Sequence, residues 1–96
     1  MSVSISTHVL DTAAGRPAAG VTVELLCGPT RVTSAATDAD GRARLGEALE
    51  PGLYTLAFHP PSPFFRRVQL DVVLESGHYH VPLLVSPFSC ASYRGS

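Results

Sequence analysis

Apolar and polar residues alternate in several short runs along the chain. In the clearest run, 68–74, every second residue is Val or Leu, and Gln69 and Asp71 lie between them. Successive side chains of a β-strand point to opposite faces, so this alternation is typical of a strand with one buried face. The runs 21–27 and 54–58 repeat the pattern. The periodicity therefore predicts an all-β fold.

Residues that favour turns separate these runs. Asp38-Ala39-Asp40-Gly41 ends in the glycine that a positive φ requires, which predicts a turn between neighbouring strands, and the prolines of 59–63 exclude a helix there. Glu47–Glu50 has room for one helical turn at most. We expect seven or eight short strands, at 4–11, 21–27, 31–37, 42–45, 53–58, 67–75, 79–85 and 89–93.

Length and charge limit the classes of protein to consider. A chain of 96 residues can build one hydrophobic core, so we expect a single domain over 1–96. The longest apolar run, 81–85, is far shorter than the ~20 residues that span a bilayer, and no basic stretch followed by an apolar one begins the chain. The net charge is -1 with scattered arginines, which disfavours nucleic acid as a partner. We expect a cytoplasmic protein with no membrane partner.

The two cysteines, Cys27 and Cys90, lack the close spacing of a zinc or redox motif. Cys27 continues the apolar face of 21–27, so we expect it to be a buried thiol that behaves as a small hydrophobe. A reducing cytoplasm is consistent with this interpretation.

Histidines share a face with apolar residues in two of the expected strands. If Ile5, Thr7 and Val9 face the core, His8 and Leu10 face outward; in 79–85 the corresponding outer face carries His80, Pro82 and Leu84. Exposed apolar patches of this kind usually mark a surface covered by a partner or ligand. A symmetric oligomer would cover this one and enclose the imidazoles in a partly desolvated cleft. Pro82 has no N–H, which predicts a bulge or an unpaired position.

These residue types suit acid–base chemistry. Histidine exchanges protons near neutral pH, so His8 and His80 could divide the roles of base and acid, while Arg42 could stabilise an oxyanion. Each also has an ordinary explanation, as a surface or interface histidine or as a solvated arginine at a strand end. A zinc site formed by His78, His80 and His8 is a further alternative. The residues alone leave these alternatives open.

Two other motifs are weaker. Asp38-x-Asp40-Gly41 matches the opening of a calcium loop, but the later ligands and the closing glutamate are absent, which favours a simple turn. Ser96 lacks the glycine-flanked turn that presents a serine nucleophile.

Four segments, in order, resemble the signature segments of the 5-hydroxyisourate hydrolase family. They are STHVLD at 6–11, DADGR at 38–42, HYHVPLL at 78–84 and YRGS at 93–96. The resemblance runs from 4 to 96, and its closing tetrapeptide is the feature that separates these hydrolases from transthyretin, the hormone carrier with the same fold.

This resemblance implies a transthyretin-like sandwich of two four-stranded antiparallel sheets. It also implies a homotetramer, a dimer of dimers with active sites between the dimers. The implied reaction is hydrolysis of 5-hydroxyisourate to 2-oxo-4-hydroxy-4-carboxy-5-ureidoimidazoline in urate breakdown. Water is the nucleophile, and no metal or other cofactor is required.

By resemblance, the catalytic positions are His8, Arg42, His80 and Ser96. One histidine would deprotonate water and the other would assist proton transfer; which one is the base stays open. The residues expected to contact the substrate are Tyr93, Arg94, Leu10 and Pro82.

The sequence departs from the family pattern at two places. Only 59–65 fills the interval where the family carries a short helix, so that helix is expected to be reduced or missing, and Cys90 stands where an aromatic residue is common. Two rival functions remain: a transthyretin-like carrier of small ligands, and a purely structural sandwich. Tyr93 disfavours the carrier, because a bulky side chain there would close an open channel. The structural alternative leaves His8, Arg42 and His80 unexplained.

Overall fold

Every regular element in residues 2–95, the part of the chain that the computed structural model describes, is a β-strand. The strands are β1 (Val3–Asp11), β2 (Arg16–Pro17), β3 (Thr22–Cys27), β4 (Thr30–Ala36), β5 (Arg42–Leu49), β6 (Gly52–His59), β7 (Val68–Leu74), β8 (Gly77–His80), β9 (Leu83–Ser86) and β10 (Ser89–Ser92). The all-β prediction is confirmed. Nothing helical within 2–95 has the length and apolar character to cross a bilayer.

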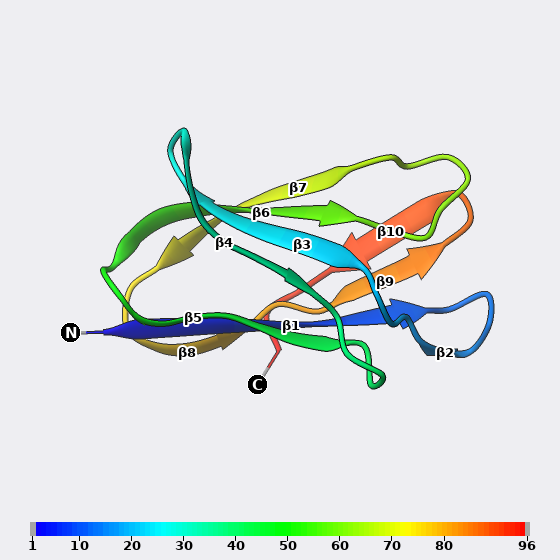
Figure 1. Ribbon diagram of the computed structural model, residues 1–96, viewed down its shortest axis with the longest axis horizontal. Helices are drawn as coiled ribbons and strands as arrows, with labels where there is room; N and C mark the ends of the chain where they lie inside the picture. Colours follow the sequence, from blue (N-terminus) through cyan, green and yellow to red (C-terminus); the bar gives the residue numbers. More distant parts are fainter. Residues whose placement is uncertain (1, 96) are drawn as a thin grey trace.

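The strands form two layers (Figure 1). One layer has the order β4-β3-β6-β7 and is antiparallel throughout. In the other, β1 pairs along one side with β5 and then β2, and along its other side with β8 and then β9, which in turn pairs with β10. The six elements of this second layer thus occupy four strand positions, because β2 continues the position of β5 and β9 continues that of β8. The predicted sandwich is confirmed.

Two pairings differ from the antiparallel expectation: β1 runs parallel to β8 and to β9. A hairpin forces its two strands to be antiparallel, whereas a long crossover connection allows parallel ones. The chain between β1 and β8 passes through the whole of the opposite layer, so it forms such a crossover.

Neither of the two segments in which the sequence left little or no room for a helix contains one. The segment 59–65 contains no helix, as predicted. At 47–50, where the sequence allows one helical turn at most, β5 continues to Leu49, which pairs with Val3 across an irregular part of the β1–β5 ladder. The ladder provides partners for backbone groups that a helical turn would otherwise have to satisfy internally.

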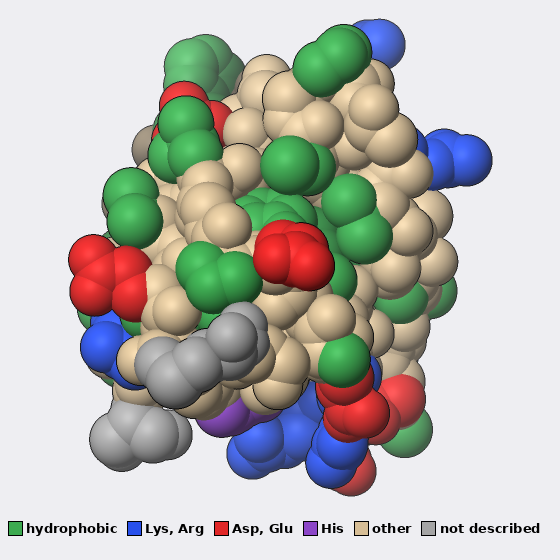
Figure 2. Space-filling view, turned by 90° about the vertical axis from the view of Figure 1, so that its left-hand side faces the viewer, with side chains coloured by type: hydrophobic (Ala, Val, Ile, Leu, Met, Phe, Trp, Pro, Cys, Tyr) green, Lys and Arg blue, Asp and Glu red, His purple; other side chains and the backbone are tan. Residues whose placement is uncertain are grey.

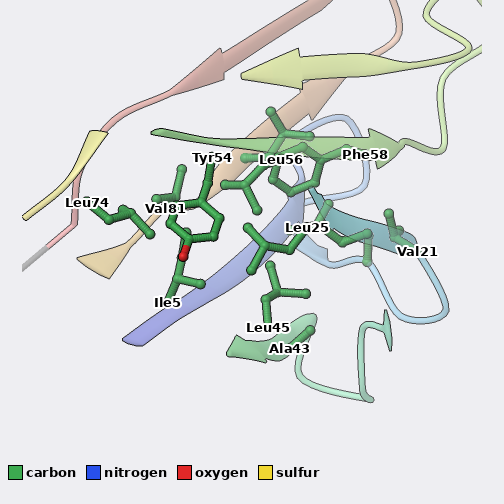
Figure 3. Close-up of a cluster of buried hydrophobic side chains, with 14 of the residues drawn as sticks. Ile5, Val21, Leu25, Ala43, Leu45, Tyr54, Leu56, Phe58, Leu74 and Val81 are labelled. Atoms are coloured by element: carbon green, nitrogen blue, oxygen red, sulfur yellow. The ribbon is translucent and has the colours of Figure 1, made fainter. Parts of the chain in front are cut away.

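The core lies between the layers. Ile5 and Leu45 from one layer meet Leu25 and Leu56 from the other, and each is at most 1% exposed (Figure 3). Ile5 belongs to the predicted inner face of β1, which is fully buried, so the opposite face with His8 points away from the core.

The expected strand 79–85 is interrupted between β8 and β9. Thr7, fully buried on β1, donates its hydroxyl to the Val81 carbonyl at 2.6 Å, and the Val81 N–H donates to the Ser6 carbonyl. Pro82 lies in the interruption, as its missing N–H predicts. It is also buried. The interruption does not change the alternation, because β8 and β9 pair with β1 at the same offset (Ser6 with His80, Leu10 with Leu84) and Val81 and Leu83 both belong to the core. The expected place of Pro82 on the outer face stays a prediction.

The prediction of a buried Cys27 is wrong, since its side chain is exposed. Cys27 is the last residue of β3, where the β3–β4 hairpin projects beyond the rest of its layer (Figure 1). Cys90 is half-buried, and this burial raises the pKa of its thiol.

Candidate active site

His8, Arg42 and His80 come from three neighbouring strands. His8 pairs directly with Arg42 across β1 and β5, and His80 lies opposite Ser6 across β1 and β8. The ring centroids of His8 and His80 are 6.4 Å apart, with their planes inclined by 42°. The three predicted groups therefore meet on the outer face of one layer.

The turn at 38–41, which is held by hydrogen bonds to the Asp38 side chain, positions Arg42. One carboxylate oxygen of Asp38 accepts hydrogen bonds from the N–H groups of Asp40 and Arg42, both at 2.9 Å. Gly41 has φ +76°, and its carbonyl accepts a 2.7 Å hydrogen bond from the Val9 N–H. The expected turn is present, but it joins β4 of one layer to β5 of the other and not two paired strands. It fastens the start of β5 beside β1.

A polar cleft of about 550 Å³ opens over this face. His8 is not part of its lining, but its ring centroid lies 6.4 Å from that of His80, which is. Arginine side chains with a histidine beside them gather at the lower edge of the face in Figure 2. The side chains that line the cleft include Ser4, Ser6, Asp38, Arg42, Arg44, Glu47, His78 and His80.

His80 lies in an environment that disfavours its charged form. Partial burial lowers the pKa of His80, and the positive charge of Arg42 lowers it further, with smaller effects from His8 and His78. An imidazole with a lowered pKa is neutral at pH 7 and has a lone pair available to accept a proton. The geometry thus provides a base beside a guanidinium.

Two serines outside the predicted set of site residues contact the histidines of β8. Ser6 Oγ lies 2.9 Å from His80 Nδ1 and 2.9 Å from His78 Nε2, and Ser4 Oγ lies 2.7 Å from His78 Nδ1. The signal was present in the sequence, because Ser4 and Ser6 precede His8 at spacings of two on the same face.

The same contacts bear on the zinc alternative. Both ring nitrogens of His78 are engaged by serine hydroxyls. Among residues 2–95, no three His, Cys, Asp or Glu side chains come close enough together to hold a metal ion. The three imidazoles do not converge in the way that alternative requires.

The tail runs beside His80, because the Gly95 N–H donates to its carbonyl. Arg94 stacks on Tyr79, with 4.0 Å from its guanidinium carbon to the ring centroid, and Tyr93 is 59% exposed. Tyr93 and Arg94 line a separate hollow of about 340 Å³ and not the histidine cleft. Ser96 lies outside the described residues.

Leu10 and Pro82, the other two residues expected at the substrate, do not line the histidine cleft either. Leu10 is half-buried near the far end of β1, where it pairs with Leu84, and Pro82 is buried in the break between β8 and β9. A role for them in substrate binding stays a prediction.

Comparison with known proteins places this geometry in a family. The family model described as HIUase/Transthyretin family matches residues 5–95. The chain belongs to the HIUase/Transthyretin family. A family member from Deinococcus radiodurans, named 5-hydroxyisourate hydrolase, is 48% identical over 96% of this chain and 95% of its own length. Another of that name, from Caulobacter vibrioides, is 43% identical over 96% and 97%.

Solved structures of the family agree on the fold. A Klebsiella pneumoniae 5-hydroxyisourate hydrolase matches with a TM-score of 0.90 and 36% identity over the full length of both chains. Sea bream transthyretin matches with a TM-score of 0.82 at 24% identity, which shows the shared fold alone. The alignment with the Deinococcus relative spans 113 positions, so this 96-residue family member has internal deletions relative to it. This agrees with the short connection at 59–65.

Proposed function

We propose that the protein hydrolyses 5-hydroxyisourate to 2-oxo-4-hydroxy-4-carboxy-5-ureidoimidazoline, a step of urate breakdown. The observation that carries the proposal is the meeting of His8, Arg42 and His80 on one sheet face. Relatives that match nearly the whole chain bear the name of this hydrolase. A carrier needs neither a paired set of imidazoles nor an adjacent guanidinium.

In the proposed mechanism, neutral His80 accepts a proton from water at Nε2. The resulting hydroxide adds to the carbonyl carbon of the cyclic amide, and the guanidinium of Arg42 stabilises the oxyanion that forms. The C–N bond then breaks, and the leaving nitrogen receives a proton with the help of His8. His80 is assigned as the base because its burial and its cationic neighbour Arg42 lower its pKa and keep it neutral. Ser96 would position water or substrate.

We further propose that the active protein is a homotetramer with the histidine face of one dimer covered by another. Half-buried Leu10 and Leu84 and exposed Tyr93 support this, because apolar groups on an outer face favour a covering partner. Tyr93 and Arg94 would then reach substrate across a subunit boundary. Sedimentation velocity tests the assembly, and a single monomeric species at micromolar concentration would refute it. A cytoplasmic location stays a prediction.

The direct test of function uses substrate generated freshly from urate by urate oxidase. The ultraviolet decay of 5-hydroxyisourate is followed with the protein and, as the control, without it. Acceleration well above the spontaneous decay is expected. Binding of the substrate without acceleration would favour the carrier alternative and remove the hydrolase.

The lowered pKa of His80 predicts the shape of the pH profile. As the pH falls through this pKa, a proton occupies the base, so kcat/KM should be flat near pH 7 and fall only below about pH 6.5, the usual histidine value. Arg42→Gln removes a positive charge that lowers this pKa, so the acid limb of its residual activity should move to higher pH. Arg16→Gln, on exposed β2, is the matched control. A wild-type acid limb above pH 7 would contradict the assignment.

A further inference from the structure

One continuous line of hydrogen-bonding groups joins four side chains: those of Ser4, His78, Ser6 and His80. It runs from Ser4 Oγ to His78 Nδ1, from His78 Nε2 to Ser6 Oγ, and from Ser6 Oγ to His80 Nδ1. The inner end, His80, is half-buried at the cleft, while His78 is exposed. In the single chain, the line therefore connects the proposed base with the surface, and the proposal needs the His78 end to stay open to solvent in the tetramer.

The parallel register of β1 and β8 produces this line. Ser4 lies opposite His78 and Ser6 lies opposite His80, so all four side chains share one face. Ser6 stands between the two imidazoles and, among residues 2–95, is the one hydroxyl within hydrogen-bond distance of both.

A hydroxyl has one hydrogen, so Ser6 can donate to only one of its two imidazole partners at a time. If it donates to His80 Nδ1, the neutral His80 ring carries its hydrogen on Nε2 and can act only as an acid there. If it donates to His78 Nε2, His80 carries its hydrogen on Nδ1 and offers the Nε2 lone pair as a base. The orientation of one hydroxyl therefore selects between acid and base.

We propose that Ser6 is a positioning residue that sets the tautomer of His80 and connects it through His78 to solvent. This role deepens the proposed hydrolysis and rests on it. After His80 gains a proton from water at Nε2, its Nδ1 proton can move to Ser6. The Ser6 hydrogen then passes to His78 Nε2, and the His78 Nδ1 proton passes towards Ser4. Each group gains and loses one proton, so one proton reaches the surface and His80 is neutral again, now with its hydrogen on Nε2. When that Nε2 hydrogen leaves to the product or to solvent, a proton passed inward along the same groups returns Nδ1 to its protonated form, and His80 is again a base.

The test compares Ser6→Ala with Ser6→Thr, which keeps a hydroxyl and suits a strand. Ser34→Ala, an exposed strand serine in the opposite layer, is the matched control. Ser6→Ala should lower kcat about 10-fold or more with little change in KM, because the imidazole remains while its tautomer is no longer set. Ser6→Thr should recover most of this loss, and Ser34→Ala should match the wild type.

A second readout needs no substrate. The ¹⁵N chemical shifts of the ring nitrogens of His78 and His80 report their tautomers, and Ser6→Ala should change both sets. If that variant fails to fold, His78→Phe at the exposed end should still change the shifts of His80. Unchanged kcat in Ser6→Ala, or unchanged His80 shifts in either variant, would overturn the role of Ser6 alone. Absence of turnover in the wild type would remove the proposed function together with it.

Discussion

Replacing His80 by alanine is expected to lower kcat for 5-hydroxyisourate by ~10² or more, because it removes the proposed general base. His8→Ala is expected to have a similar effect through the loss of the assisting imidazole. Both side chains lie on the outer face of their layer, so the buried core should stay intact. Steady-state kinetics should show kcat and kcat/KM falling together, which is typical of an interaction made in the transition state.

A matched control for these variants is His59→Ala. His59 lies at the end of β6 in the opposite layer, is exposed, and contacts Glu24 at the surface. Its loss should leave the rate near that of the wild type and change stability little, because ion pairs between exposed side chains are screened by solvent. Near-normal rates in both His8→Ala and His80→Ala would place the catalytic groups elsewhere.

Gly41→Ala is expected to destabilise the fold by about 2–5 kcal/mol. About 1–2 kcal/mol comes from the left-handed conformation at φ +76°, and about 1–3 kcal/mol comes from overpacking. A Cβ there would lie 2.5 Å from the Val9 carbonyl oxygen and 2.9 Å from Pro17 Cβ, so backbone must shift. Urea denaturation measures the loss. Activity should fall as well, because the turn that places Arg42 beside His8 would move.

Gly28→Ala is the control that separates the two causes of the lost stability, the left-handed conformation and the overpacking. Gly28 also has a positive φ, of +58°, but nothing lies within 4 Å of a Cβ built on it. It should lose only the conformational part, about 1–2 kcal/mol, and retain full activity. Equal losses in the two variants would show that close approach at Gly41 contributes nothing.

Most of the fold can be predicted from the sequence, because the alternation of apolar and polar residues in a strand follows the alternation of its buried and exposed faces. In β1 the buried residues are Val3, Ile5, Thr7 and Val9, which leaves His8 on the predicted outer face. The alternation does not predict burial correctly where burial depends on what packs over a strand. Cys27 continues an apolar face but lies at a projecting hairpin, so its side chain is exposed. Pro82 is buried although alternation assigns it to the outer face.

The candidate site was predictable only in part, for a related reason. Composition supplied the imidazoles and Arg42 as candidates, and resemblance singled them out. The position of the serine hydroxyls beside the imidazoles depends on the parallel register of β1 with β8. Alternation within single strands cannot reveal that register. The position of Tyr93 and Arg94 over a separate hollow likewise depends on the path of the tail past His80.

The same parallel register affects how the protein folds. The serines of β1 and the histidines of β8 that they contact are 72 to 74 positions apart in the chain. Such distant contacts are slow to form, because the entropy of closing the intervening loop is lost before the contacts reward it. A nascent chain on the ribosome would therefore complete the layer β4-β3-β6-β7 before β8 can join β1. Catalytic competence should appear in one late step, so the gain of activity during refolding would report completion of the whole sandwich.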